Sequence, residues 1–177
     1  MEQTQTPVVR CPCCGETFTL TDDLYVGPTP PAQAAPAEPT PAVSYPPGAS
    51  PIVLIFDGGS IGNPGDGYGS YQLTVEGRVE APRRLEFGPN YTNNEAEYDT
   101  LIAALEQVLL RSRDPRAVYL DIRGDSQLVI KQITGQWKIK EPRMQQRAAH
   151  VHHLLRQVGG WRATWHGRAN SVEALGH

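Results

Sequence analysis

The sequence contains no run of apolar residues long enough to form a membrane-spanning helix, which needs about 20 of them. Its first residues, MEQTQTPVVR, also lack the basic and then apolar pattern of a signal peptide. Cysteine is scarce: the chain has three, Cys11, Cys13 and Cys14, and neighbours so close do not make a disulfide framework. We therefore expect a soluble, cytoplasmic protein with no membrane partner. We also expect a monomer, since no sequence feature calls for an obligate protein partner.

A strong excess of either charge is missing too, since the formal net charge is −3. The acidic excess lies in residues 1–51, which hold one basic and five acidic residues, whereas residues 52–177 hold 15 basic and 14 acidic residues. Charge alone therefore neither indicates nor excludes a nucleic-acid partner, because binding depends on local patches and on any metal.

Residues 27–51 lack lysine and arginine altogether and are rich in proline and alanine. Such a segment cannot build a core, so its composition predicts an extended, disordered linker. The linker separates a Cys-containing appendage at 1–26 from a zone at 52–177 where strand and helix patterns alternate.

The appendage contains CPCCG, which resembles one knuckle of a zinc ribbon. A zinc site normally takes four ligands, often from a second C-x-x-C pair, and the chain has no such pair. Zn²⁺ at Cys11 and Cys14, completed by Cys13, a distant histidine or another chain, is therefore less favoured than a degenerate, zinc-ribbon-like remnant.

The third zone predicts an α/β fold with the element order β-β-β-α-β-α-α-β-α. Its first strand is a continuous apolar run, IVLIFD, typical of a strand buried on both faces, and we expect it to stop at Asp57. A tight turn at Glu76-Gly77 joins the next two strands, and Pro142 lies early in a helix. The expected strands are 52–57, 68–75, 78–87, 117–122 and 161–166, and the expected helices are 93–112, a short one from Ser126, 141–158 and a last one near 169–177.

The stretch YTNNEAEY, at the start of the long helix, contains a carboxylate in an unexpected place. Thr92 and Glu95 fit a capping box. Glu97, however, lies on the same helical face as Leu101 and Val108, which should pack on a core. A carboxylate on that face is costly unless it is paired, hydrogen-bonded or bound to a metal.

Two further acids, Asp57 and Asp125, lie at or just after the ends of predicted strands. Strand ends in α/β sheets are common ligand sites, so both acids could converge with Glu97. Crowded carboxylates repel unless cations neutralise them, and oxygen ligands suit Mg²⁺ or Mn²⁺. Taken singly, Asp57 could at least as well be a turn residue and Asp125 a helix N-cap.

Three segments, FDGGSIGNPGDGYGSY, TNNEAEY and GDSQLVIKQITGQW, resemble the three motifs of ribonuclease H, type 1, in order and spacing. The resemblance covers residues 52–176. It implies a ribonuclease H-like fold with a five-stranded mixed sheet flanked by helices. It also implies an endoribonuclease that cleaves the RNA strand of RNA–DNA hybrids and leaves 5′-phosphate and 3′-hydroxyl ends. Two Mg²⁺ or Mn²⁺ ions would be held by the family's acids, which match Asp57, Glu97 and Asp125.

The same resemblance assigns contacts with the hybrid to a set of small and amide-bearing residues. Amide side chains can donate to and accept from the 2′-hydroxyls that distinguish RNA from DNA. Helix capping remains an alternative for the two asparagines of TNNE, and a plain turn for the one in GNPG. The assigned positions are Gly58, Ser60, Asn63, Asn93, Asn94 and Gln127.

The chain departs from the family pattern in two places. It lacks the basic, Trp-containing insertion with which many relatives grip the hybrid, and it resembles the compact form of the family. Part of that grip could come from Lys138, Lys140, Arg143 and Arg147, although a solvated helix face is the favoured interpretation for each of them. In GRANSVEALGH, Glu173 is the candidate fourth metal-site acid, with an exposed helical residue as the equal alternative.

Two other functions stay open at this point. A hybrid-binding module with weak or lost catalysis would follow if the altered fourth acid removes activity. A nuclease of the wider superfamily that acts on DNA is the third reading, although the amide-rich motifs argue against it.

Overall fold

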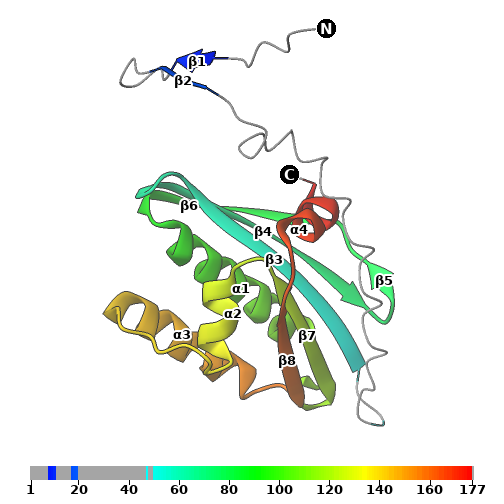
Figure 1. The fold of residues 1–177 in the computed structure, drawn as a ribbon. Helices are drawn as coiled ribbons and strands as arrows, with labels where there is room; N and C mark the ends of the chain where they lie inside the picture. Colours follow the sequence, from blue (N-terminus) through cyan, green and yellow to red (C-terminus); the bar gives the residue numbers. More distant parts are fainter. Residues whose placement is uncertain (1–7, 11–16, 20–46, 48–49, 177) are drawn as a thin grey trace, which may run out of the picture. The chain divides into compact units, whose positions relative to one another are not determined.

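The computed structural model describes residues 8–10, 17–19, 47 and 50–176 (Figure 1). The chain divides into two compact units, residues 1–43 and 44–177. None of the described helices is long and apolar enough to cross a bilayer.

In the first unit, β1 (Val8–Arg10) and β2 (Thr17–Thr19) form a two-stranded antiparallel sheet. The three cysteines between these strands lie outside the described residues, and so does the zinc site considered at Cys11 and Cys14. Most of the predicted linker also lies outside them.

The second unit contains a mixed sheet flanked by helices, which confirms the predicted fold class. The order across the sheet is β5-β4-β3-β7-β8, and β6 pairs with β4 outside this path. β3 runs antiparallel to β4 and parallel to β7, and β7 runs parallel to β8. The strands are β3 (Ser50–Gly62), β4 (Gly65–Val75), β5 (Arg78–Val79), β6 (Arg83–Tyr91), β7 (Val118–Gly124) and β8 (Gly160–Trp165).

The helices α1, α2 and α3 lie on one side of the sheet in Figure 1. α1 packs against β3, β4 and α3, whereas α4 packs against β3. Their bounds are α1 (Asn93–Arg111), α2 (Gln127–Ile133), α3 (Pro142–Leu155) and α4 (Arg168–Leu175), and a 3-10 turn, η2, covers Pro115–Ala117.

The first strand of this sheet does not stop at Asp57, as the apolar run predicts, but continues to Gly62. The apolar run ends where pairing with β7 ends, at Phe56 opposite Gly124. Beyond that point β3 still pairs with β4, down to Gly62 opposite Gly65. The apolar run therefore corresponds to the part of β3 that has a paired strand on each side, and not to the whole strand.

The third predicted strand is divided, so the sheet has six strands instead of five. The predicted turn at Glu76-Gly77 is confirmed: both residues have positive φ angles, 52° and 77°, as tight hairpin turns require. β5 then ends at Val79, and β6 begins only after Pro82, which has no N–H to donate to a ladder.

The core lies between α1 and the sheet. Leu54 and Phe56 of β3 and Ile122 of β7 are fully buried against the stripe of α1 that includes Leu101 and Leu105. The helix begins where the sequence predicts, because Thr92 and the third helical residue, a glutamate, form the full capping box. This packing holds the first turns of α1 beside the middle of β3.

Candidate active site

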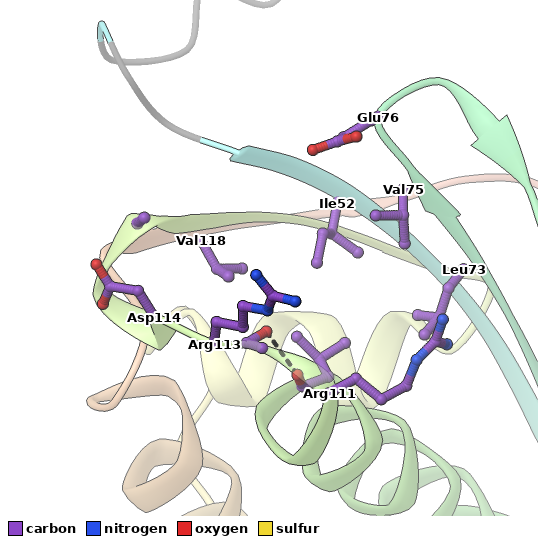
Figure 2. A pocket seen from close by; sticks show the side chains of 11 residues that line it. Ile52, Leu73, Val75, Glu76, Arg111, Arg113, Asp114 and Val118 are labelled. Carbon is purple, nitrogen blue, oxygen red and sulfur yellow. Dashed lines mark hydrogen bonds between the residues drawn. The ribbon is translucent and has the colours of Figure 1, made fainter.

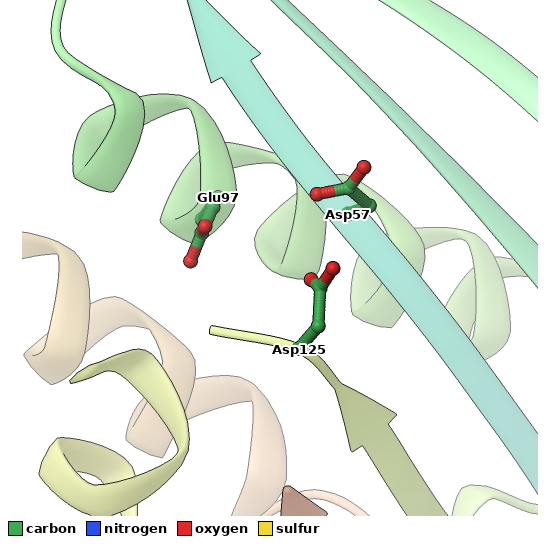
Figure 3. Close-up of side chains that lie close together, drawn as sticks. All are labelled: Asp57, Glu97 and Asp125. Carbon is green, nitrogen blue, oxygen red and sulfur yellow. The ribbon is translucent and has the colours of Figure 1, made fainter. Parts of the chain in front are cut away.

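Three carboxylates from separate parts of the chain meet at one edge of the sheet. Asp57 lies in β3, Glu97 in α1 and Asp125 in the bend that follows β7 (Figure 3). One oxygen of each carboxylate lies within 4.8 Å of the others. Among the residues that the structure describes, this is the one such group of three or more potential metal ligands.

The two aspartates lie just after the last residues through which β3 and β7 pair in parallel. Asp57 is buried, with 7% of its surface exposed, and lies one residue beyond the last β3–β7 pair, Phe56 with Gly124. β4 continues to support it there, because Asp57 pairs with Ser70. Asp125 follows Gly124 directly. Both acids therefore stand where the parallel pairing of β3 with β7 ends, and α/β sheets form ligand sites beyond such ends.

Glu97 reaches the cluster because α1 lies directly on β3. A Cβ atom at Gly58 would lie 2.6 Å from the carbonyl carbon of Ala96 and from the amide nitrogen of Glu97, so this close approach requires glycine. Gly58 therefore has a packing reason of its own, beside the predicted substrate contact. The Oε2 atom of Glu97 is buried, and no hydrogen-bond partner is recorded for it among the described residues.

The cluster disfavours its own negative charge. Burial, followed by the charges of Asp125 and Asp57, raises the pKa of Glu97 to about 8. Burial and the charge of Asp57 also raise the pKa of Asp125. Divalent cations would relieve this repulsion, and hard carboxylate oxygens are the ligands that Mg²⁺ and Mn²⁺ prefer. The donor set therefore fits such ions.

Residues around the start of α4 add positive charge beside the cluster. The charge of Arg168, the first residue of α4, offsets part of the rise in the pKa of both Glu97 and Asp125, and that of His166 offsets part of the rise for Asp125. Glu173 is exposed on α4 and does not belong to the group of three acids, so its role as a fourth acid stays a prediction.

Several predicted substrate positions are joined by hydrogen bonds. The backbone N–H of Ser60 donates to Asn93 Oδ1 at 2.8 Å, and the backbone N–H of Asn93 donates to Asn63 Oδ1 at 3.2 Å. The tip of the β3–β4 hairpin is thereby fixed to the first residue of α1. The other polar candidates are exposed, namely Asn94, Gln127, Lys138 and Lys140.

Two of the basic residues considered as contacts for the hybrid, Arg143 and Arg147, have acidic partners within the fold. Arg143 and Arg147 lie 3.1 Å and 3.4 Å from the same oxygen of Glu95, the capping residue of α1. Arg147 also donates to both carboxylate oxygens of Asp99, at 2.9 Å and 3.0 Å. These contacts join α3 to α1, and the capping-box pattern in the sequence does not predict them.

Trp165 lies beside the cluster, and no pattern in the sequence marks it as a site residue. Its indole N–H donates to the backbone carbonyl of Asp125 at 3.0 Å. Its location could have been predicted from the strand order. Trp165 ends β8, which runs parallel to β7, so the carboxyl ends of the two strands lie side by side.

A separate hollow of about 390 Å³ lies toward the other end of β3 (Figure 2). Its floor is apolar and includes Ile52, Leu73 and Val118, and Arg111 and Arg113 stand among its polar lining residues. None of the three clustered acids lines it. We therefore place the candidate active site at the carboxylates and not at this hollow.

Comparisons with known proteins identify the family. The Reverse transcriptase-like family model matches residues 73–175. Ribonuclease HI of Halobacterium salinarum is 37% identical over 134 residues, which cover 75% of this chain and 65% of that protein. A bifunctional protein of Mycobacterium tuberculosis is 33% identical over 124 residues, 70% of this chain and 33% of that protein. The chain thus spans about two thirds of the first relative and one third of the second.

Solved structures give the same result. The crystal structure of RNase H1 from Halobacterium salinarum has a TM-score of 0.64 and 37% identity, covering 71% of this chain and 93% of that one. LC11-RNase H1 in complex with an RNA/DNA hybrid has a TM-score of 0.64 and 29% identity, covering 69% of this chain and 89% of that one. This chain belongs to the reverse transcriptase-like family and, within it, to the type 1 ribonucleases H.

Proposed function

We propose that this protein is an endoribonuclease that cleaves the RNA strand of RNA–DNA hybrids, leaving 5′-phosphate and 3′-hydroxyl ends. The observation that carries the proposal is the meeting of Asp57, Glu97 and Asp125 within 4.8 Å of one another. The similarity to an RNase H1 that was solved with an RNA/DNA hybrid supports the choice of substrate. We also propose that one chain suffices, because all three acids come from the same chain.

The three acids would hold two Mg²⁺ or Mn²⁺ ions. The Oε2 atom of Glu97 is buried and has no hydrogen-bond partner within the part of the chain that the structure describes, and the pKa of that residue is raised. Both features support this assignment, because an uncompensated carboxylate is costly in such a place. When bound, a pair of such ions supplies activation of a water nucleophile and stabilisation of the leaving oxygen. Glu97 would have to release its proton before it could act as a ligand.

The surrounding residues would orient the hybrid against this cluster. The hydrogen bonds among Ser60, Asn63 and Asn93 fix the hairpin tip before substrate arrives, so little conformational freedom is lost on binding. The exposed amides of Asn94 and Gln127 can donate to and accept from 2′-hydroxyls in the wide, shallow minor groove of a hybrid. These contacts would select the RNA strand by its hydroxyls.

The test is cleavage of an end-labelled RNA–DNA hybrid by the full chain with Mg²⁺ or Mn²⁺. We expect products with 5′-phosphate ends, no cleavage of the matching DNA duplex, and no activity in Asp125→Asn. Cleavage of the DNA duplex would contradict the substrate assignment. Tight binding of the hybrid without cleavage, by a well-folded wild type with either ion, would show a binding module instead.

A further inference from the structure

The three clustered acids differ in how the backbone supports them. Asp57 lies inside β3 with β4 paired beside it, and Glu97 lies inside α1. Asp125 lies in neither a strand nor a helix, but in the bend between the end of β7 and the first residue of α2. Repulsion from the other two acids therefore acts on the carboxylate whose backbone has the least regular support.

Contacts on both sides of Asp125 replace that support. On one side, the backbone N–H of His166 donates to the carbonyl of Gly124 at 3.1 Å and extends the β7–β8 pairing by one bond. On the other side, the hydroxyl of Ser126 caps α2 by accepting the N–H of Val129 at 3.3 Å. The carbonyl of Asp125 itself remains between these anchors, beyond the end of the ladder.

From this geometry we infer that Trp165 is a positioning residue for Asp125. Its indole N–H, at 3.0 Å from the Asp125 carbonyl, holds the peptide that carries the carboxylate. Fixing that peptide restricts the backbone angles of the bend, and those angles determine where the carboxylate points. This inference rests on the proposed function only in what Asp125 does; the tether itself is a property of the protein alone.

The position of the indole ring sets the size of the effect. Trp165 is 49% exposed, so water competes for the bond and about half of the side chain lies outside the packed interior. Loss of the N–H should therefore loosen the bend without unfolding the protein. Trp165→Phe keeps a six-membered aromatic ring but removes the donor together with the five-membered ring that carries it.

Trp137 offers a matched control. It is exposed to a similar degree, 43%, and its ring lies against Lys131 with the ammonium 4.8 Å from the ring centre. No acceptor for its indole N–H is recorded among the described residues, and it lies outside the carboxylate cluster. Trp137→Phe therefore makes the same chemical change without removing a tether.

The first measurement is amide hydrogen exchange of the segment 124–126 in the metal-free full chain. We expect exchange there to be about tenfold faster in Trp165→Phe than in wild type, and unchanged in Trp137→Phe. Because this readout needs neither substrate nor catalysis, it tests the tether even if the proposed function fails. Unchanged exchange in Trp165→Phe would overturn the inference.

The second measurement separates positioning from substrate contact. In Trp165→Phe we expect Mn²⁺ affinity by calorimetry to fall about fivefold and kcat on a hybrid to fall about tenfold, with KM within about twofold of wild type. A rise in KM with kcat and Mn²⁺ affinity unchanged would overturn the inference and show that the ring touches substrate. Faster exchange with normal hybrid cleavage would also overturn it, since the tether would then not serve the site.

Discussion

β7 and the bend after it carry two acids, Asp121 and Asp125, whose surroundings differ sharply. Asp121 is fully buried, and its carboxylate receives the guanidinium groups of Arg123 and Arg162 at 2.6 Å and 2.7 Å. Burial alone would raise the pKa of Asp121, but the hydrogen bonds and charges of these arginines hold it below its usual range. Asp125 has two acids beside it, and its pKa is raised.

The comparison shows how neighbours decide the use of a buried carboxylate. The negative charge of Asp121 is compensated within the fold by two arginines. Because Arg162 belongs to β8, the carboxylate of Asp121 joins β7 to β8. Asp125 instead shares its site with Asp57 and Glu97, and the repulsion among the three acids leaves an energetic demand that a cation can meet. Substitutions of the two acids should therefore have opposite consequences.

The largest effect is expected from Asp125→Asn. Loss of a metal ligand should lower hybrid cleavage by about a thousandfold or more, equivalent to about 4 kcal/mol of barrier. Because the change removes a repelling charge, the metal-free protein should unfold at an equal or higher temperature. Hybrid cleavage assays and thermal unfolding check both parts. Near-normal turnover in the variant would contradict the assignment of Asp125 to the metal site.

Asp121→Asn should show the reverse pattern. Removing the acid leaves Arg123 and Arg162 without their shared partner, and the partial exposure of both arginines limits the cost to about 2–3 kcal/mol of unfolding free energy. Turnover well below the unfolding transition should stay within about twofold of wild type. Urea unfolding and cleavage rates provide the measurements. Lost turnover with unchanged stability would break the comparison between the two acids.

A pH dependence should distinguish the metal-free cluster from the paired acid. The folded protein retains the proton of Glu97 up to pH about 8, because its pKa is raised, whereas the unfolded chain releases it near the ordinary pKa of a glutamate, 4.5. The metal-free protein should therefore lose stability as pH rises from about 5 to 8, by about 1–3 kcal/mol. Thermal unfolding across this range measures the slope, and Glu97→Gln, which cannot titrate, should reduce it. An equal slope in this variant would show that other groups cause it.

Much of the fold could be predicted because its main signals are local. Each of these signals is made of residues that lie only a few positions apart. They are the apolar run of β3, the turn at Glu76-Gly77 and the capping box of α1. The extension of β3 to Gly62 could not be predicted, because it depends on pairing with β4 and not on hydrophobicity. Helical periodicity singled out Glu97 from the sequence, since a carboxylate on an apolar face needs a partner.

The supporting contacts of the site could not be predicted for a different reason: strand order places Trp165 near Asp125 but does not specify which group it binds. Arg147 with Asp99, and Trp165 with the carbonyl of Asp125, join residues 48 and 40 positions apart. Neither pair has a sequence pattern that specifies the partner, because the contact arises only when the helices and strands pack. The pairing of Asp121 with Arg162, 41 positions apart, escaped prediction in the same way.

Glu173 extends the comparison to an exposed acid and should give the smallest effect. It lies on α4 outside the group of three acids, so any hold on an ion would be weak and solvent-screened, worth about 0–1 kcal/mol. Glu173→Gln should then raise the Mg²⁺ concentration needed for half-maximal cleavage less than about fivefold. The effect with Mn²⁺ should be smaller still, because Mn²⁺ loses its waters more readily than Mg²⁺ and depends less on one added ligand.

Ion titrations of wild type and the Glu173→Gln variant measure both effects, with Asp125→Asn as the reference for loss of a full ligand. Identical curves with both ions would make Glu173 a surface residue and leave a site of three acids; a loss as large as that of Asp125→Asn would mean that α4 closes on the cluster when ions bind.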